Sequence, residues 1–371
     1  MKSHPEIPLP GIKVNLSDIE NELKQFWQGT AHEGKTTTIR ASTMNLVILN
    51  RQDEKIDEIV RCIPEISAHH PGRVILAFSS PSISSEKITA SVSAFCQLQD
   101  ADKKQISCEQ IALATGKSGE KYLPGTLLPV LLPDLPLYTY LSSDDLLMEE
   151  TFYPFYEMTD RLILNSNDRV NSLDELEQRI DRIIQLRNKC KISDINWSLL
   201  KPWREALAQF FDDRDKIDLL NDILDVSIRY SGGGYCLSAY LLIAWLATRL
   251  KWRISKSDPQ NQLYTFARDR TIQVKMTPSE PAQAVEGLRR VEINFRTTSK
   301  KPHFEAERNS GSMIRVNMAG IRSSVPIPAL SHSSILCNEL DFLYYDDVLM
   351  DSIKMISAMI KEGQNEVVYQ Y

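Results

Sequence analysis

The sequence predicts a two-domain α/β protein, with a Rossmann-like N-terminal α/β sandwich followed by an α+β domain that contains an antiparallel meander. Three observations predict this fold class. A chain of 371 residues is too long for one ordinary hydrophobic core. Residues 46–49 and 74–78 are continuous apolar runs, as expected of parallel strands buried on both faces. Beyond about residue 191, short segments alternate apolar and polar residues, which is typical of antiparallel strands with one solvent-facing side.

Residues 1–40 are expected to form an N-terminal helix and a linker. Ile19, Leu23 and Phe26 recur at helical spacing within residues 18–27. The polar stretch 29–38 predicts the linker that separates this helix from the first domain.

Residues 41–190 are expected to form the N-terminal α/β domain. In order, the patterns predict a strand at 46–49, a charged helix at 53–62, a strand at 74–78, a hairpin with arms at 88–98 and 105–113, a strand at 135–141, a helix at 144–158, a strand at 161–164 and a final helix. Ser172 and Glu175 have the spacing of a capping box at the start of that final helix. Buried strands joined by crossover helices predict the Rossmann-like sandwich, and the hairpin predicts an antiparallel edge.

Residues 191–371 are expected to form the α+β domain. Pro202 stands where the first turn of a helix tolerates proline, and Trp203 and Phe210 follow at helical spacing. Residues 238–250 are almost entirely apolar, which predicts a buried helix. The meander is predicted by alternating segments at 272–276, 291–295 and 312–318, and residues 346–361 predict a closing helix.

Charge is unevenly distributed along the chain. The net charge is -6, yet residues 249–301 carry twelve Lys and Arg against five Asp and Glu. This basic stretch indicates either a face for an acidic surface, a phosphate or a nucleic acid, or basic side chains on the solvent side of strands. Aromatic residues lie nearby, but no known nucleic-acid-binding module accompanies them, so we expect no nucleic-acid partner.

No segment of the sequence predicts a membrane span or a secretory signal. The most apolar run, 237–250, is shorter than the roughly 20 residues that a span needs. The first residues lack the apolar core of a signal peptide. The six cysteines form no CxxC pair, which is typical of reduced thiols, and we expect a cytoplasmic protein.

Motifs for catalysis, cofactors and metals are incomplete. Residues 115–118, TGKS, resemble the end of a P-loop, but Ile111 occupies the position where that loop needs glycine. The glycines at 232–234 precede an apolar helix and offer amides to an anion, but no GxGxxG follows and a plain loop is the alternative. The histidines match no metal-ligand spacing, and no GxSxG elbow is present. We therefore expect no enzyme activity, no cofactor and no metal.

Cys96 and Cys108 form a candidate redox pair. If Leu98 faces Ile106 across the hairpin, the same register sets Cys96 opposite Cys108, where the two thiols come close enough to oxidise. The alternative is two reduced, buried thiols.

Five short segments, taken in order, resemble motifs of a known family. His70 to Ile75 resembles an HPSR-plus-strand motif, and the other similar segments are 128–136 (PLL-PDLP), 159–163 (ADRLI), 194–205 (DLNW…WRE) and 244–252 (WLASRLGW). The family is that of glucose-6-phosphate dehydrogenase assembly proteins (OpcA), and the resemblance runs from about residue 40 to 345. The chain departs from the family pattern at Gly72, usually Ser, and at Tyr138 and Tyr140, usually Trp, which affects only the detail of the partner surface.

The resemblance implies a non-catalytic assembly factor and allosteric activator. Such a protein binds glucose-6-phosphate dehydrogenase, the first enzyme of the oxidative pentose phosphate pathway, and promotes its active oligomer. The candidate residues, as partner contacts or as domain-junction structure, are His70, Arg73, Asp134, Asp160, Arg161, Asp194, Trp197, Trp203 and Arg204. The alternative function is a sugar-phosphate or nucleotide-binding regulator or enzyme that uses the α/β domain and the basic stretch 249–301.

Overall fold

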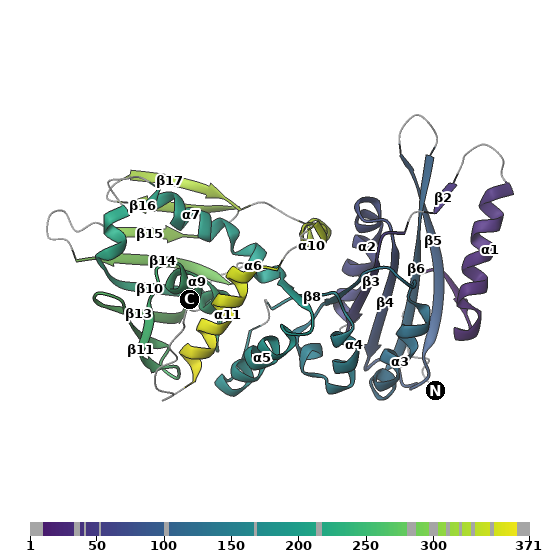
Figure 1. The fold of residues 1–371 in the computed structure, drawn as a ribbon, viewed down its shortest axis with the longest axis horizontal. Coiled ribbons are helices and arrows are strands. Elements are labelled where there is room, and N and C mark those ends of the chain that lie inside the picture. The colour runs from purple at the N-terminus through teal and green to yellow at the C-terminus, as the bar shows by residue number, and fades with distance from the viewer. Residues whose placement is uncertain are drawn as a thin grey trace. The chain divides into compact units, whose positions relative to one another are not determined.

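The computed structural model describes residues 10–32, 38–40, 42–51, 53–99, 104–166, 169–212, 217–279, 287–296, 303–308, 312–318, 321–327, 331–341 and 345–361. The chain divides into two compact units. The N-terminal unit comprises residues 1–165, 186–195 and 330–345, and the C-terminal unit comprises residues 166–185, 196–329 and 346–371. Each unit is built around one large sheet (Figure 1).

The sheet of the N-terminal unit contains β1 (Ile12–Val14), β2 (Thr38–Arg40), β3 (Asn45–Asn50), β4 (Arg73–Ser80), β5 (Thr89–Gln99), β6 (Lys104–Gly116), β7 (Leu137–Leu141), β8 (Arg161–Leu164) and β9 (Lys191–Asp194). Its strand order is β1-β5-β6-β4-β3-β7-β8-β9, and β2 pairs with β6 outside this path. Every residue of β3 and β4 is buried, as the apolar runs predict.

Strands β6, β4, β3, β7, β8 and β9 run parallel to one another. From β3 the chain first adds β4 and β6 on one side and then crosses back to add β7, β8 and β9 on the other side. This reversal at β3 and β7 is the topological switch point of a doubly wound sheet. Together with the second mixed sheet described below, it confirms the predicted fold class of a mixed α/β protein with a Rossmann-like first half.

The helices and short 3-10 turns of this unit are η1 (Leu16–Asp18), α1 (Ile19–His32), α2 (Asp53–His69), η2 (Lys117–Tyr122), α3 (Leu123–Leu127), η3 (Leu128–Val130), η4 (Asp144–Met148), η5 (Glu150–Phe152), α4 (Tyr153–Glu157) and α10 (His332–Asp341). Two of them differ from the expected bounds. Helix α2 continues through Pro64 to His69. The expected helix at 144–158 is instead two 3-10 turns and α4, whose first turn contains Pro154, a residue with no N–H to continue a preceding helix.

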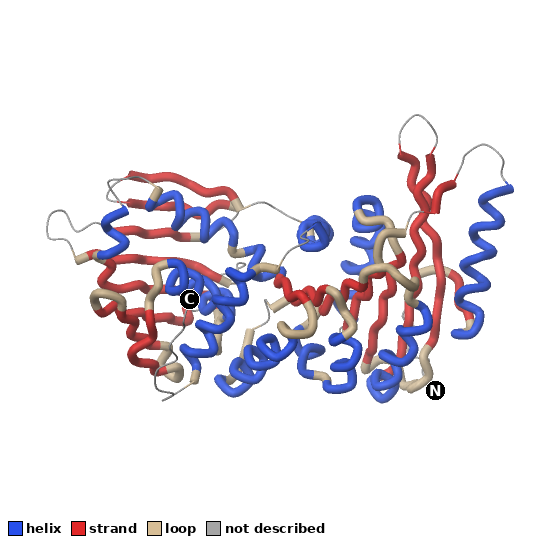
Figure 2. The backbone as a smooth tube through the Cα atoms, in the orientation of Figure 1, coloured by secondary structure: helices blue, strands red, loops and turns tan. Residues whose placement is uncertain are grey.

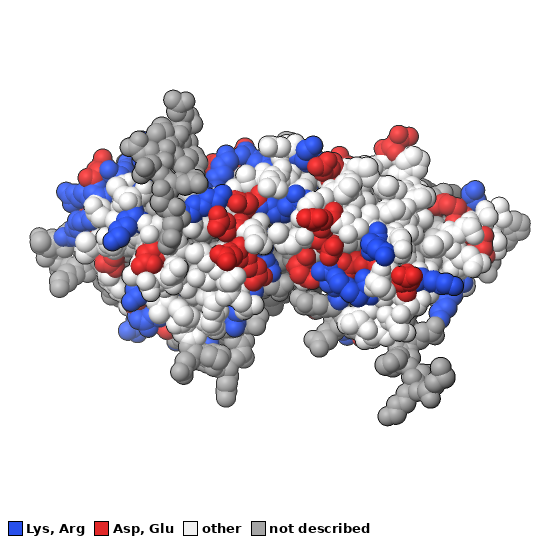
Figure 3. Space-filling view, turned by 90° about the horizontal axis from the view of Figure 1, so that it is seen from below, with Lys and Arg blue, Asp and Glu red and all other residues white. Residues whose placement is uncertain are grey.

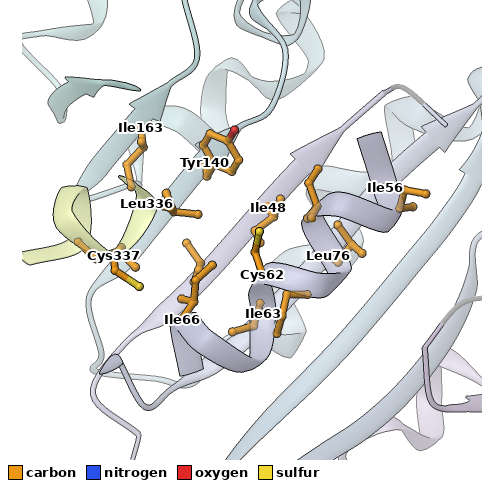
Figure 4. Packing of buried hydrophobic residues seen from close by; sticks show 14 of the residues in the cluster. Ile48, Ile56, Cys62, Ile63, Ile66, Leu76, Tyr140, Ile163, Leu336 and Cys337 are labelled. Atoms are coloured by element: carbon orange, nitrogen blue, oxygen red, sulfur yellow. The ribbon is translucent and has the colours of Figure 1, made fainter. Parts of the chain in front are cut away.

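Helix α10 reaches the N-terminal unit from the far end of the sequence. Ile335, Leu336, Cys337 and Leu340 of α10 pack in one buried cluster with residues of α2 and the sheet (Figure 4). The division of the chain therefore differs from the expected boundaries, because residues 330–345 complete the first core. Residues 166–185 belong to the C-terminal unit, where Val170 pairs with Tyr235 and Asp181 accepts a 2.8 Å bond from Lys361.

The sheet of the C-terminal unit has the order β11-β12-β13-β10-β14-β15-β16-β17 (Figure 2). Its strands are β10 (Ile223–Ser231), β11 (Arg253–Asp258), β12 (Leu263–Ala267), β13 (Thr271–Ser279), β14 (Leu288–Phe295), β15 (His303–Glu307), β16 (Met313–Met318) and β17 (Ile321–Pro326). Neighbours pair antiparallel except β10 and β13, which are parallel. The strand β10 thus separates two antiparallel runs, β11 to β13 and β14 to β17.

The helical elements between and around these strands are α5 (Leu173–Leu186), α6 (Ile195–Leu199), α7 (Lys201–Phe211), η6 (Asp218–Asn221), α9 (Leu237–Arg249) and α11 (Asp347–Ile360). Helices α7, α9 and α11 lie against one face of the C-terminal sheet, where Phe210 of α7 packs on Phe304 with ring centroids 5.1 Å apart (Figure 1). The buried helix and the closing helix that the sequence predicts are α9 and α11. Within the described ranges, no helix has the length and apolar character that crossing a bilayer requires.

The register of the β5–β6 hairpin corrects the cysteine hypothesis. Cys96 pairs with Ser107, and Cys108 pairs with Phe95, so the expected register was wrong by one residue. A shift of one residue exchanges the faces of a strand, and the two cysteines are not a directly opposed pair. The Cys108 thiol instead donates to the carbonyl of Ser67 at 3.3 Å. The side chain of Cys96 and the hairpin tip at 100–103 lie outside the described residues.

We expect the α10 contribution to be measurable by substitution. Leu336 is 1% exposed, so Leu336→Ala should lower the free energy of unfolding by about 2–5 kcal/mol through lost burial and a cavity. Asn338 is exposed on the same helix, and Asn338→Ala should change stability by less than about 0.5 kcal/mol. Urea denaturation of both variants checks this, and equal stabilities would show that α10 is not part of the core.

Candidate functional site

The carboxyl ends of β3, β4, β6 and β7 meet at one edge of the N-terminal sheet. In doubly wound sheets, ligands bind at this edge in the crevice at the switch point, and a glycine-rich turn after the first strand admits their phosphates. The corresponding turn here follows β3 and reads Arg51, Gln52, Asp53, with no glycine. The side chain of Arg51 therefore lies where a ligand phosphate would approach the sheet.

The guanidinium of Arg51 is held by three carboxylates. It donates to Glu120 at 2.9 Å, to Asp145 at 2.8 Å and to Glu149 at 2.7 Å. Glu120 lies on η2 after β6, its side chain is 5% exposed, and it also accepts a hydrogen bond from Ser79 near the end of β4. We call Arg51, Ser79, Glu120, Asp145 and Glu149 the carboxyl-edge cluster. It joins the segments that follow β3, β6 and β7 to the end of β4.

The charges of the carboxyl-edge cluster are strongly coupled. Burial by itself would raise the pKa of Glu120, but hydrogen bonds from Arg51 and Ser79 outweigh it and lower that pKa. The pKa of Asp145 is lowered in the same way, against burial, by Ser143 and Arg51. For Arg51, burial opposes the charged form, yet the bonds to Glu120 and Asp145 raise its pKa. Arg51, Glu120 and Asp145 are thus ionised near neutral pH.

This arrangement does not suit a phosphate. A pyrophosphate placed at the switch point would lie beside three carboxylates, whose negative charges would repel it. Arg51, the cation that could bind the pyrophosphate, is already paired with these carboxylates. The P-loop-like segment does not change this, because Lys117 lies on η2 with its Nζ 3.3 Å from Glu120. The charges at this edge are thus paired with one another.

The opposite, amino edge of the same sheet is held by a buried amide. Asn45, at the start of β3, is 1% exposed. Its side chain donates to the carbonyl of Leu132 at 2.9 Å and accepts from the backbone N–H of Leu132 at 2.8 Å. The Asn45 backbone N–H donates to the carbonyl of Pro136 at 2.8 Å. Residues 131–136, the amino-edge loop, are thereby fixed to β3 at both of their ends.

Arg73 holds the segment just before that loop. Its side chain is 1% exposed and lies at the start of β4. It donates to Glu109 of β6 at 2.7 Å, to Glu20 of α1 at 2.5 Å and to the carbonyl of Val130 at 2.7 Å. Burial opposes the charged guanidinium, but the carboxylates of Glu20 and Glu109 raise the pKa of Arg73. Arg73 therefore connects four elements and presents no surface of its own.

The other candidate residues of the N-terminal unit differ in exposure. Asp134 is exposed, and Asp160 is exposed while accepting the backbone N–H of Leu137 at 2.8 Å. His70 is partly exposed, with its Nε2 3.5 Å from Asp341. Arg161 and Asp194 are buried, and burial lowers the pKa of Arg161. The structure thus brings Arg73, Asp134 and Asp160 to one edge.

The candidates of the C-terminal unit form a compact group at α6, α7 and α11. Trp197 and Trp203 are buried. The Trp197 indole donates to Asp346 at 2.7 Å, and the Arg204 guanidinium lies 3.5 Å from the centre of the Trp197 ring. Burial lowers the pKa of Arg204 to about 10 against the opposing charge of Asp346. Asp346 also caps α11 by accepting the N–H of Leu349, so this group fixes the start of α11.

The basic stretch lies on β11 to β14 of the C-terminal unit, with 280–286 and 297–301 outside the described residues. Part of its charge is paired locally. Arg270 lies 2.9 Å from Asp222, and Arg290 lies 2.7 Å from Glu292 and 3.3 Å from Glu305. Basic and acidic side chains are interspersed on the face that Figure 3 shows. The stretch is consistent with basic residues on the solvent side of strands.

Sequence reasoning did not find Arg51, Glu120, Asn45 and Glu109. Two of them had a signal. Arg51 is a charge placed directly after a buried strand, and Glu109 interrupts the apolar register of β6. A charge in a buried strand requires a partner, but the sequence does not say which one.

Comparison with known proteins identifies both halves of the chain. Residues 63–181 match the family described as glucose-6-phosphate dehydrogenase subunit N-terminal domain, and residues 190–353 match the C-terminal domain of the same subunit. The OxPP cycle protein OpcA of Synechocystis is 29% identical over 189 residues, which are 50% of this chain and 38% of that protein. Its namesake from Nostoc punctiforme is 27% identical over 212 residues, 56% of this chain and 44% of that protein. The matched part spans less than half the length of these curated relatives.

A solved structure, a super-repressor mutant of Gal80p from Saccharomyces cerevisiae, is also similar. It is 10% identical, covers 86% of this chain and 95% of its own, and has a TM-score of 0.45. That score carries no conclusion about fold or function.

We expect the stability of the fold to fall when the carboxyl-edge cluster loses its cation, Arg51. Arg51→Met leaves the Glu120 carboxylate buried without its main partner, and should lower the free energy of unfolding by about 3–5 kcal/mol. Adding Glu120→Gln should recover part of that loss. Arg61→Met, at an exposed position on α2, should cost less than about 0.5 kcal/mol.

The pH dependence has a definite sign. Because the pKa of Glu120 is lowered in the folded state, its stabilisation is present above the ordinary carboxyl pKa of about 4.3 and is lost as pH falls through the lowered value. Urea denaturation from pH 7 to pH 3 should therefore show a steeper loss for the unaltered chain than for Arg51→Met with Glu120→Gln. If the free energy of unfolding fell with pH equally for both chains, the coupling between Arg51 and Glu120 would be contradicted.

Proposed function

This chain belongs to the OpcA family of glucose-6-phosphate dehydrogenase subunits, and we propose that it is a non-catalytic partner that binds this dehydrogenase and favours its active oligomer. The observation that carries the proposal is the match of both domains of that subunit, in order, over residues 63–181 and 190–353. The association with the dehydrogenase in the family description supports the partner. The assembly role and a cytoplasmic location are part of the proposal.

The carboxyl-edge cluster supports a role without catalysis. In a doubly wound sheet, the switch point is where a dehydrogenase would hold its nicotinamide cofactor. In this chain Arg51 and its three carboxylates occupy that position. The charged side chains at this position are paired with one another. This arrangement agrees with a subunit that binds another protein through its surface.

The thermodynamic requirement for activation is simple. A partner shifts an assembly equilibrium only by the difference between its affinities for the two states. The coupling is reciprocal, so the active oligomer must bind this chain more tightly than the inactive form does. A change from about 1% to about 99% active would need a difference of roughly 10⁴-fold in affinity.

The alternative function, a sugar-phosphate or nucleotide-binding regulator, receives less support. It requires an accessible anion site in the α/β unit, where the switch point presents paired carboxylates. Of the basic side chains on β11 to β14 that it would use, Arg270 and Arg290 are already in local ion pairs.

The proposal is tested with purified chain and the dehydrogenase of the same organism. Light scattering after size exclusion should show a joint complex and a shift of the dehydrogenase to a larger oligomer. Initial rates should rise, or the KM for glucose 6-phosphate should fall, in proportion to bound chain. An unrelated protein of equal net charge is the control. No complex, or a complex with unchanged rates and assembly, contradicts the proposal.

A ligand test separates the two functions. The free chain is heated with NADP⁺, with NAD⁺ and with glucose 6-phosphate, each at millimolar concentration. We expect an unchanged Tm, because a ligand stabilises only a folded state that binds it. A concentration-dependent rise in Tm with any of them would favour the alternative.

A further inference from the structure

The amino-edge loop holds a residue in an unfavourable backbone conformation. Asp134 has a φ of 60°, in the left-handed region that few residues other than glycine adopt, aspartate and asparagine more often than most. Pro133 precedes it, and Pro136 ends the loop. The Asp134 side chain is exposed and, within the described ranges, makes no hydrogen bond or ion pair. This carboxylate therefore gives its own fold nothing in return for the strain.

Buried polar groups keep the loop in this shape. Asn45 binds Leu132 through two hydrogen bonds, of 2.9 and 2.8 Å. Arg73 binds the carbonyl of Val130 at 2.7 Å, just before the loop. Asp160 accepts the N–H of Leu137 at 2.8 Å, just after it. A strained conformation persists when its surroundings over-determine it, and such positions gather at binding sites.

The exposed surface of residues 128–136 mixes one carboxylate, that of Asp134, with apolar groups. Leu128, on η3 ahead of the loop, is 44% exposed, and Pro133 and Pro136 are exposed as well. A rigid, proline-bracketed loop loses little conformational entropy when a partner covers it. An unpaired carboxylate beside apolar side chains matches a protein surface that presents a lysine or arginine at the rim of an apolar patch.

We propose that the amino-edge loop is a preformed docking element for glucose-6-phosphate dehydrogenase, with Asp134 paired to a lysine or arginine of that enzyme. The identity of the partner rests on the proposed function above. The loop lies within the matched N-terminal subunit domain, residues 63–181. At the carboxyl edge of the sheet the charges are paired around Arg51, whereas the amino-edge loop offers a fixed surface whose carboxylate has no partner among the described residues.

Two substitutions at one position separate binding from folding. Asp134→Asn keeps a residue that tolerates the left-handed region and removes the charge. It should leave the Tm unchanged and weaken binding to the dehydrogenase about ten- to hundredfold, the range for a lost charged hydrogen bond. Asp134→Gly relieves the strain, so it should raise the Tm while weakening binding to a similar degree. Asp57→Asn, at an exposed carboxylate on α2, is the matched control and should bind as the unaltered chain does.

The measurement is the Kd by isothermal titration with the purified dehydrogenase, at low and at high salt, beside the Tm of each free variant. Normal affinity for both Asp134 variants overturns this inference and leaves the proposed function standing. Absence of any complex with the unaltered chain overturns the proposed function, and this inference with it. Equal weakening by Asp57→Asn would also overturn it, because the effect would then be one of net charge.

Discussion

Arg73 carries a guanidinium with 1% exposure, and a cation in such a position destabilises a fold unless every N–H finds an acceptor. Glu109, Glu20 and the carbonyl of Val130 supply these acceptors from three other elements. The packing of α1, β6 and η3 against the start of β4 therefore depends on this side chain. Its hydrogen bonds also hold α1, β6 and η3, which are far apart in sequence, beside one another.

The two edges of that sheet have opposite characters. At the carboxyl edge, Arg51 neutralises carboxylates that would otherwise repel one another, at the place where doubly wound sheets bind their ligands. At the amino edge, Asn45 and Arg73 use their buried hydrogen bonds to hold an exposed loop in a strained shape. Paired charges at one edge and a fixed, exposed loop at the other are the two features on which the proposed binding role rests.

Local patterns in the sequence predicted most elements, because their causes are local. The apolar runs of β3 and β4 show burial on both faces, and the Ser172 hydroxyl caps α5 by accepting the N–H of Glu175 at 3.1 Å, while the Glu175 carboxylate accepts the N–H of Asn171. Long-range features were not predictable in this way. The docking of α10 on α2 joins residues more than 250 positions apart, and the β5–β6 register depends on a hairpin whose pattern fits two alignments. The resemblance supplied Asp134 and Arg73 as candidate residues, but no local pattern shows that Asp134 is exposed and Arg73 is buried.

We propose that this chain binds its partner through the amino edge of its N-terminal sheet, while the side chains at the carboxyl edge keep their ion pairs with one another. Hydrogen exchange of the chain, alone and bound to glucose-6-phosphate dehydrogenase, tests this proposal. We expect slower exchange on binding in residues 128–136, with exchange in 79–82 and 142–149 unchanged. Protection at 79–82 and 142–149 without protection at 128–136 would contradict it.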